Sequence, residues 1–325
     1  MGNYFSNSQN INIPENELNN NNKYDYLVFS GAGIKGISYC GALEILNELN
    51  ILYKNNTLKL KGLAGTSAGS IIAGLLAVGY TPNELKKIMM DIDFNRIVDD
   101  KLCYLSEVYN LYNSYGLCEG NYIYNLLGEL IKTKTGNSDY TIIDLYNDKQ
   151  IKLVITGTNV NLKKTIYFNP LNSNDKFKNI PIRTAIRISM GIPFIFEPYL
   201  YENDYYIDGG VLDNYPIHVF DDDIPNQRKI HNHLNMKVLG FHIMTPDDYN
   251  DINNRSNING ILNYSVSLID IFIVQNERVY NNPNYTKRTI TIITPNIPLT
   301  KFNLTEQQKI ELFDIGKETT RKYFS

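Results

Sequence analysis

Two glycine-rich turns near the N-terminus constrain the fold of this chain more than any other feature. The first turn spans residues 31–36 and the second spans residues 65–69. Each follows a predicted strand, at residues 26–29 and 58–64, and each opens a stretch with apolar side chains at helical spacing. A strand, a turn and a helix repeated in this order are typical of a parallel sheet with crossover helices. The sequence therefore predicts an α/β fold.

The rest of the chain continues this alternation of strands and helices. Apolar runs predict further strands at residues 152–159, 237–243 and 288–293. Helical spacing predicts helices at residues 36–49, 68–79, 82–93, 120–132, 181–189, 261–279 and 305–321. We expect the polar residues 1–23 to form a flexible tether and residues 24–325 to form one domain. Within that domain, residues 93–134 read as a helical insertion and residues 246–259 as a loop.

Composition and charge exclude several classes of protein. The chain is 43% hydrophobic and 20% charged, which permits a sizeable core. Its net charge of −3 gives no electrostatic reason to expect nucleic-acid binding. The longest apolar stretch, residues 71–79, is too short to span a bilayer, and the polar N-terminus does not fit a secretory signal.

The cysteines point to a reducing compartment. Cys40, Cys103 and Cys118 are odd in number and widely spaced, so they form neither a disulfide framework nor a zinc site. We therefore expect a cytoplasmic protein.

The first glycine-rich turn has two interpretations. Its residues fit the G-x-G-x-x-G pattern of dinucleotide-binding folds: Gly31, Ala32, Gly33, Ile34, Lys35 and Gly36. That function requires an acidic residue at the end of the second strand, and residues 50–65 contain none. The alternative is an oxyanion hole, in which the amides of Gly33 and Ile34 donate to a developing negative charge and Lys35 adds a positive charge nearby.

The second turn has the pattern G-x-S-x-G, formed by Gly65, Thr66, Ser67, Ala68 and Gly69. In a sharp strand–turn–helix elbow such a serine is exposed at the helix N-terminus, where the helix dipole favours developing negative charge. The pattern alone occurs often by chance, and tight packing also explains its small residues. Its position between a strand and a helix favours Ser67 as the nucleophile of an acyl-transfer reaction.

The residues leave open which base activates this serine. His218 and His242 both follow it, which permits the order Ser…Asp…His, although His242 fits a packed position within a strand. Asp208 ends an apolar run and precedes Gly209 and Gly210. A partly desolvated aspartate at a strand end could accept the proton directly because its pKa would be raised. The same residues also fit a hairpin turn.

Together these blocks resemble the patatin-like phospholipase family. The glycine turn at 31–36, the elbow at 65–69 and the Asp-Gly-Gly block at 208–210 occur in the order of that family. Residues 185–193 are similar to the helix-and-proline segment that walls its active site. Ala32 departs mildly from the family, where a third glycine is common, but alanine keeps the backbone amide. The similarity covers roughly residues 24–220.

This resemblance implies both a fold and an activity. The fold is a three-layer α/β arrangement with a mostly parallel sheet, with the nucleophile on the strand–turn–helix elbow. The activity is phospholipase A or lysophospholipase hydrolysis of acyl esters by a Ser67–Asp208 dyad through an acyl–serine intermediate. The resemblance implies that this reaction uses no catalytic histidine, metal or cofactor. Two alternatives stay open: a Ser-His-Asp esterase that uses His218 or His242, and a catalytically silent scaffold tethered to membranes.

A lipid enzyme must also reach a membrane surface. The N-terminus fits M-G-x-x-x-[ST], the signal for myristoylation of Gly2, and we expect peripheral membrane binding through that group. Residues 1–22 carry no Lys, Arg or Cys, so this single chain would bind reversibly. Tyrosines at positions 104, 109, 112, 115, 122 and 124 suit a lipid boundary, but ordinary packing explains them better.

We expect protein made in a eukaryotic cell to carry a myristoyl group that intact-mass measurement detects and Gly2→Ala removes. An unmodified Gly2 would contradict this expectation.

Overall fold

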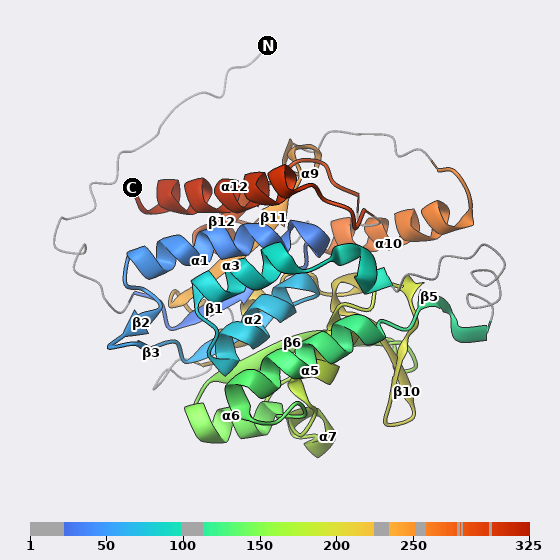
Figure 1. The fold of residues 1–325 in the computed structure, drawn as a ribbon, viewed down its shortest axis with the longest axis horizontal. Helices are drawn as coiled ribbons and strands as arrows, with labels where there is room; N and C mark the ends of the chain where they lie inside the picture. The colour runs from blue at the N-terminus through green and yellow to red at the C-terminus, as the bar shows by residue number, and fades with distance from the viewer. Residues whose placement is uncertain are drawn as a thin grey trace, which may run out of the picture.

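The computed structural model describes residues 23–98, 113–223, 234–250, 258–277, 280, 282–298 and 301–325. The eight strands of its main sheet have the order β12-β11-β1-β4-β6-β10-β9, and β7 also pairs with β6 (Figure 1). Five strands are mutually parallel: β1 (Tyr26–Phe29), β4 (Gly62–Gly65), β6 (Lys152–Asn159), β11 (Val238–Met244) and β12 (Thr289–Ile293). The antiparallel strands are β7 (Lys164–Phe168), β9 (Tyr199–Tyr201) and β10 (Asp204–Asp208).

The parallel strands are apolar because both faces of the sheet are covered. Leu27 and Phe29 of β1 face a large core, whereas Tyr26 and Val28 face a smaller one. This division follows from the two-residue period of a strand. Parallel sheets are usually buried on both faces, so short continuous apolar runs are the expected sequence pattern.

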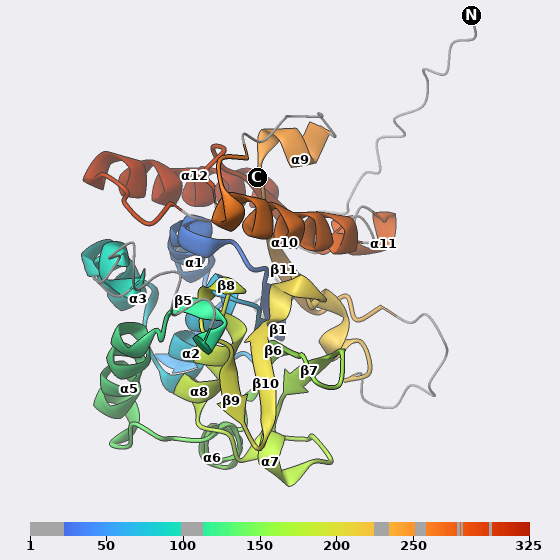
Figure 2. The same ribbon diagram turned by 90° about the vertical axis from the view of Figure 1, so that its right-hand side faces the viewer.

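The large core lies under one layer of helices (Figure 2). This layer contains α1 (Ser38–Glu48), α2 (Ala68–Val78), α3 (Pro82–Asp91), α5 (Asn121–Thr135), α6 (Ile142–Lys149), α8 (Ile182–Ser189) and α12 (Glu306–Phe324). The smaller core is closed by the short 3-10 helix η5 (Ile217–Phe220) together with Tyr215, and Tyr280 and Tyr285 pack on it.

The first and last helices of this layer touch through their backbones. A Cβ atom on Gly41 of α1 would lie 2.0 Å from the Phe313 carbonyl oxygen, and one on Gly316 of α12 would lie 1.9 Å from that of Ser38. Only glycine permits so close an approach. Residues near both ends of the sequence therefore build the same helical layer.

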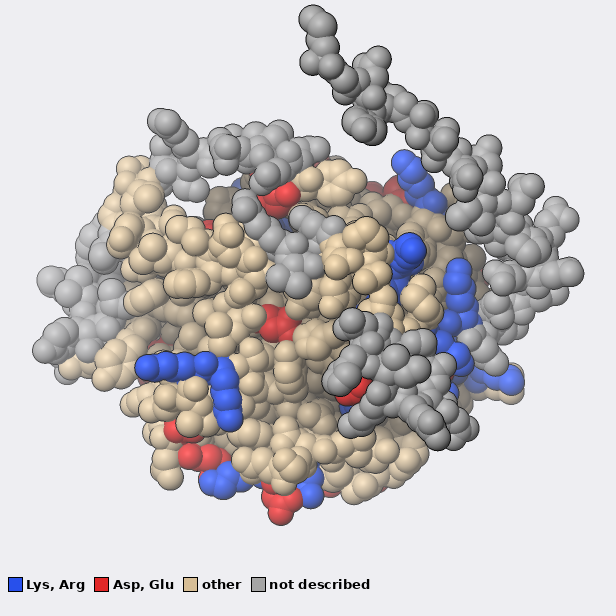
Figure 3. Space-filling model, turned by 180° about the vertical axis from the view of Figure 1, so that it is seen from behind, with Lys and Arg blue, Asp and Glu red and all other residues tan. Residues whose placement is uncertain are grey.

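Further elements complete the fold. They are η2 (Gly33–Ile37), η3 (Phe94–Val98), η4 (Gly209–Val211), α7 (Asp175–Lys178), α9 (Pro246–Asn250), α10 (Ile261–Glu277) and α11 (Pro283–Thr286). Two small sheets pair β2 (Tyr53–Lys54) with β3 (Thr57–Leu58) and β5 (Gly116–Cys118) with β8 (Phe194–Phe196). On the face seen from behind, charged side chains of the described residues are scattered among uncharged ones (Figure 3).

The predicted α/β class, with a mostly parallel sheet flanked by helices, is confirmed. Strands were predicted correctly at β1 and β6, but one strand over residues 58–64 was wrong. Leu58 ends the β2–β3 hairpin and β4 begins only at Gly62, because the intervening lysines Lys59 and Lys61 interrupt the apolar run. The predicted loop at 246–259 begins with α9, and the predicted insertion contains the strand β5 beside α5.

Some expectations fall on residues outside the described ranges. These are Gly2 with most of the predicted tether, Cys103, and the tyrosines at 104, 109 and 112. Across the part of the chain that the structure describes, every helix is too short or too polar to cross a membrane.

Candidate active site

The two glycine-rich turns lie side by side because their strands are parallel neighbours. Phe29 at the end of β1 pairs with Gly65 at the end of β4, so both turns leave the sheet at the same edge. The strands β4, β6, β10 and β9 lie on one side of β1. The last two strands, β11 and β12, lie on its other side. Ligands of open α/β sheets bind at the carboxyl ends of the strands beside such a switch in strand order.

The elbow at Ser67 is strained, and its neighbours must lack side chains. Ser67 has φ +51° and ψ −124° and stands immediately before α2. A Cβ atom on Gly65 would lie 2.3 Å from the Gly69 carbonyl oxygen, and one on Gly69 would lie 2.4 Å from that of Phe29. The glycines therefore allow the helix to turn back tightly against β1, which presents Ser67 at the helix N-terminus.

The register of β6 places Asp208 directly beyond this elbow. The strand β7 covers one side of β6 at both Ile155 and Gly157. On the other side of β6, Ile155 pairs with Gly65 of β4 and Gly157 pairs with Asp208 of β10. The strands β4 and β10 therefore lie one after the other along the same edge of β6. Gly157 follows Ile155 by two residues, just as Ser67 follows Gly65. Asp208, which pairs with Gly157, therefore lies level with Ser67 along the sheet.

The Asp208 carboxyl is buried and contacts the serine. Only 4% of Asp208 and 7% of Ser67 are exposed. Burial raises the pKa of Asp208 to about 7, although hydrogen bonds from the Gly210 amide and from the Ser67 side chain lower it. The Gly210 N–H donates to Oδ1 over 2.7 Å. A carboxyl group with a pKa near neutrality, bonded to a hydroxyl, is suited to general-base chemistry.

The first glycine turn packs on the elbow and leaves backbone donors free. A Cβ atom on Gly31 would lie 3.2 Å from the Ser67 Cβ, and one on Gly36 would lie 3.0 Å from the Ala68 Cβ. Gly33 adopts φ +53°, a left-handed conformation that favours glycine. Among the described residues, no acceptor binds the amides of Ala32, Gly33 and Ile34, or the Ala68 amide at the start of α2. Such amides can stabilise an oxyanion.

Asn214 fastens the glycine turn to the Asp-Gly-Gly block. The Gly31 N–H donates to the Asn214 carbonyl oxygen over 2.9 Å, and the Asn214 side-chain amide donates to the Gly31 carbonyl oxygen over 3.1 Å. The same side-chain amide donates to Glu277 of α10. No local sequence pattern marks Glu277, because its contact with Asn214 joins residues 63 positions apart.

Further support for the elbow comes from α8 and the 208–213 block. The Ser67 amide donates to Ser189 Oγ over 2.9 Å, and the Thr66 hydroxyl donates to the Asp213 carbonyl oxygen over 3.1 Å. The Asp208 amide donates to the Gly191 carbonyl oxygen over 2.8 Å. Ser189 and Gly191 lie in the segment that was expected to wall the site, although their individual contacts were not predicted.

Lys35 faces carboxylates of α9 and α10. Burial lowers its pKa, whereas Asp248, Glu277 and Asp270 raise it. Burial also raises the pKa of Asp270 to about 6, and Lys35 opposes that rise. The positive charge of Lys35 is thus partly balanced by these carboxylates, which reduces its effect on a reacting group at Ser67.

The two candidate histidines have other partners. His218 lies in η5 with Nε2 3.2 Å from the Tyr167 hydroxyl and 3.9 Å from Asp213. His242 is buried in β11, stacks on the Tyr215 ring at 4.7 Å and has Nε2 3.2 Å from Glu277. Within the described ranges neither ring forms a hydrogen bond with Ser67, so the geometry favours Asp208 as its base.

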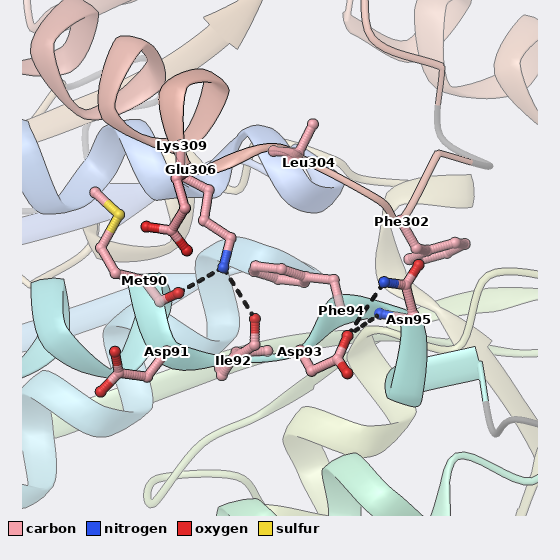
Figure 4. A pocket seen from close by; sticks show the side chains of 10 residues that line it. All are labelled: Met90, Asp91, Ile92, Asp93, Phe94, Asn95, Phe302, Leu304, Glu306 and Lys309. Carbon is pink, nitrogen blue, oxygen red and sulfur yellow. Dashed lines mark hydrogen bonds between the residues drawn. The ribbon is translucent and has the colours of Figure 1, made fainter.

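A separate cavity of about 500 Å³ lies between the end of α3, η3 and the start of α12 (Figure 4). Lys309 enters it and donates to the carbonyl oxygens of Met90 and Ile92 at the C-terminus of α3. Asp93 accepts bonds from the amide and side chain of Asn95. These polar groups satisfy one another at a helix end, and the lining contains no serine or cysteine.

The raised pKa of Asp208 predicts how stability depends on pH. The folded state keeps its proton up to about pH 7, while the unfolded chain releases it near pH 4, so stability falls as pH rises between these values. Asp208→Asn should remove this loss and stabilise the protein by roughly 4 kcal/mol at pH 8, but hardly at pH 4. Urea unfolding of both proteins at the two pH values measures the difference, and an equal effect at both would contradict the assignment.

Comparison with known proteins identifies the family of the chain. Residues 27–221 match the model of the patatin-like phospholipase family. An uncharacterized protein of Acanthamoeba polyphaga mimivirus is 31% identical over 316 residues, which cover 95% of each chain. A probable lipid hydrolase of Invertebrate iridescent virus 6 is 31% identical over 196 residues, covering 60% of this chain and 63% of the relative.

The fold also resembles that of a solved structure. VipD from Legionella pneumophila superposes with a TM-score of 0.57 at 16% identity, covering 92% of this chain and 66% of VipD. The likeness concerns the fold alone. The family match spans more than half of the chain and includes both glycine-rich turns and the Asp-Gly-Gly block. The chain belongs to the patatin-like phospholipase family.

Proposed function

We propose that this protein is a lipid acyl hydrolase of phospholipase A or lysophospholipase type that uses Ser67 as nucleophile and Asp208 as base. The observation that carries the proposal is the position of the buried Asp208 carboxyl, which lies beside β6 at the level of Ser67 and interacts with the Ser67 side chain. Family membership supports a lipid ester as substrate, as does similarity to a probable viral lipid hydrolase. Residues 24–325 would act as one catalytic domain.

The reaction would proceed in two acyl-transfer steps. Asp208 takes the Ser67 proton while the serine oxygen attacks the acyl carbon, and the negative charge develops on the carbonyl oxygen. Amides of Gly33 and Ile34 in the glycine turn and of Ala68 in the elbow would bind that oxyanion. Collapse of the intermediate releases the alcohol, which receives the proton from Asp208.

Water completes the cycle by the same route in reverse. Asp208 removes a proton from water, which attacks the acyl–Ser67 ester. The bond between the acyl carbon and the Ser67 oxygen then breaks, Asp208 returns the proton to that oxygen, and the fatty acid is released. Every proton transfer passes through one carboxyl group, so the scheme requires neither a histidine nor a metal. The strained φ of Ser67 and the free amides beside it are in place before substrate arrives, which keeps the reorganisation energy low.

The membrane remains the expected location of the substrate. Acylation of Gly2 would add a reversible anchor at that surface. The acylation of Gly2 stays a prediction from the sequence.

Fatty-acid release from mixed phospholipid vesicles tests the proposal. Ser67→Ala and Asp208→Asn should each lower the rate by at least about 1,000-fold, because either change removes a member of one catalytic unit. His218→Ala should retain activity within about threefold. His242 is buried, so His242→Gln is the better variant, and it should also remain active in a folded protein.

The same measurement separates the alternatives. Loss of activity in a folded histidine variant would favour a Ser-His-Asp esterase. Absence of release by the intact protein, with cell lysate added to supply an activator, would favour a silent scaffold.

A further inference from the structure

The helix α10 exposes a continuous apolar stripe. Tyr264, Leu268, Ile271 and Phe272 are exposed by 48%, 39%, 54% and 55%. Their spacing of four, three and one residues places them on one side of a helix. Val266 and Ile269 on the other side are buried, so the helix is held to the protein while its outer face stays open.

No charged side chain belongs to this outer face. The only charged residues of α10 are Asp270 and Glu277, and both face inward. Asp270 interacts with the half-buried Lys35, and Glu277 contacts Asn214 and His242. A helix whose charges all turn toward the protein presents a surface that can enter an apolar medium without desolvating an ion.

The inner face of α10 is bonded to the candidate active site. Asn276 donates its side-chain amide to the Val211 carbonyl oxygen over 2.9 Å, three residues after Asp208. Glu277 binds Asn214, which in turn holds Gly31 of the glycine turn. Figure 2 shows α10 crossing above the strand end that carries Asp208. The exposed stripe therefore lies on a helix fixed to the reacting groups.

We propose that the outer face of α10, formed by Tyr264, Leu268, Ile271 and Phe272, docks the protein on the surface of a phospholipid bilayer. The inference rests on the proposed function, since it takes a membrane lipid as the substrate. Interfacial helices bury such a face at the boundary between head groups and acyl chains. Docking there brings the strand end with Asp208 toward the lipid that is to be cut.

The size of the stripe favours a bilayer over a second copy of the chain. Four side chains of this kind expose on the order of 400 Å² in total at the fractions observed. A stable dimer buries about 800 Å² on each partner. A bilayer sets no such minimum, because each apolar side chain that enters it contributes separately. Since the stripe is uncharged, binding should depend little on anionic lipid or salt.

Vesicle binding of an inactive protein tests the docking face directly. The parent is Gly2→Ala/Ser67→Ala, which excludes an acyl anchor and substrate turnover. Adding Ile271→Glu and Phe272→Glu should weaken its partition into phosphatidylcholine vesicles at least tenfold. Leu171→Glu is the matched control: Leu171 is 60% exposed and lies beyond β7, at the opposite edge of the sheet, so this change should alter binding less than twofold.

A second measurement uses the absence of tryptophan from the chain. Phe272→Trp introduces a single reporter, whose emission should shift to the blue and be quenched by brominated phosphatidylcholine. Leu171→Trp should show neither change. Equal responses of the two reporters, or unchanged binding of the glutamate variant, would overturn the docking face. A dimer in solution that Phe272→Glu dissociates would overturn it as well.

Activity on two substrates separates this inference from the proposed function. In protein with Ser67 intact, Ile271→Glu/Phe272→Glu should lower hydrolysis of vesicle lipid at least tenfold and leave hydrolysis of a soluble short-chain ester unchanged. Equal loss on both substrates would contradict docking. Failure of the intact protein on both substrates, with vesicle binding still dependent on α10, would overturn the proposed hydrolase but leave the docking face supported.

Discussion

The contact between the Ser67 side chain and the buried Asp208 carboxyl is the interaction on which the account depends. Burial raises the pKa of Asp208 to about 7, against the lowering effect of hydrogen bonds from Gly210 and Ser67. The ionised form, which can accept a proton, is thus populated under ordinary conditions, but it weakens the fold. Active sites commonly retain such a loss of folding stability, because the chemistry requires the buried charge.

This contact depends in turn on backbone packing that few sequences permit. The glycines at 65 and 69 let α2 begin against β1, and β10 takes the place beside β6 that β4 vacates. The seven alanines of the chain are all buried, and six of them lie between residues 32 and 77, around the two turns. Small side chains are therefore concentrated where strands, elbow and helices approach most closely. Asn214 and Glu277 extend this packing outward, so that the exposed helix α10 is bonded to the glycine turn.

Much of this arrangement could be predicted from local sequence patterns. The parts that depend on contacts between distant segments could not. The apolar runs of β1 and β6 and the strand–turn–helix context of Ser67 are local patterns, so the fold class and the two turns could be identified. The apolar run before Asp208 also indicated a strand end, but β9 could not be identified, because it is only three residues long and partly exposed. The side-chain partners of Lys35 and the roles of Ser189 and Glu277 arise from contacts between distant segments. No spacing along the chain encodes them.

The central claim is that Ser67, activated by Asp208, forms a covalent acyl intermediate. Reaction with a long-chain alkyl fluorophosphonate, followed by peptide mass spectrometry, tests it most directly, because the phosphonyl group stays on an activated serine. One phosphonyl group per chain is expected, on the peptide that contains Ser67, with labelling lost in Ser67→Ala and strongly slowed in Asp208→Asn. A modified residue elsewhere in the active protein, or labelling of Ser67 at an unchanged rate without Asp208, would contradict it.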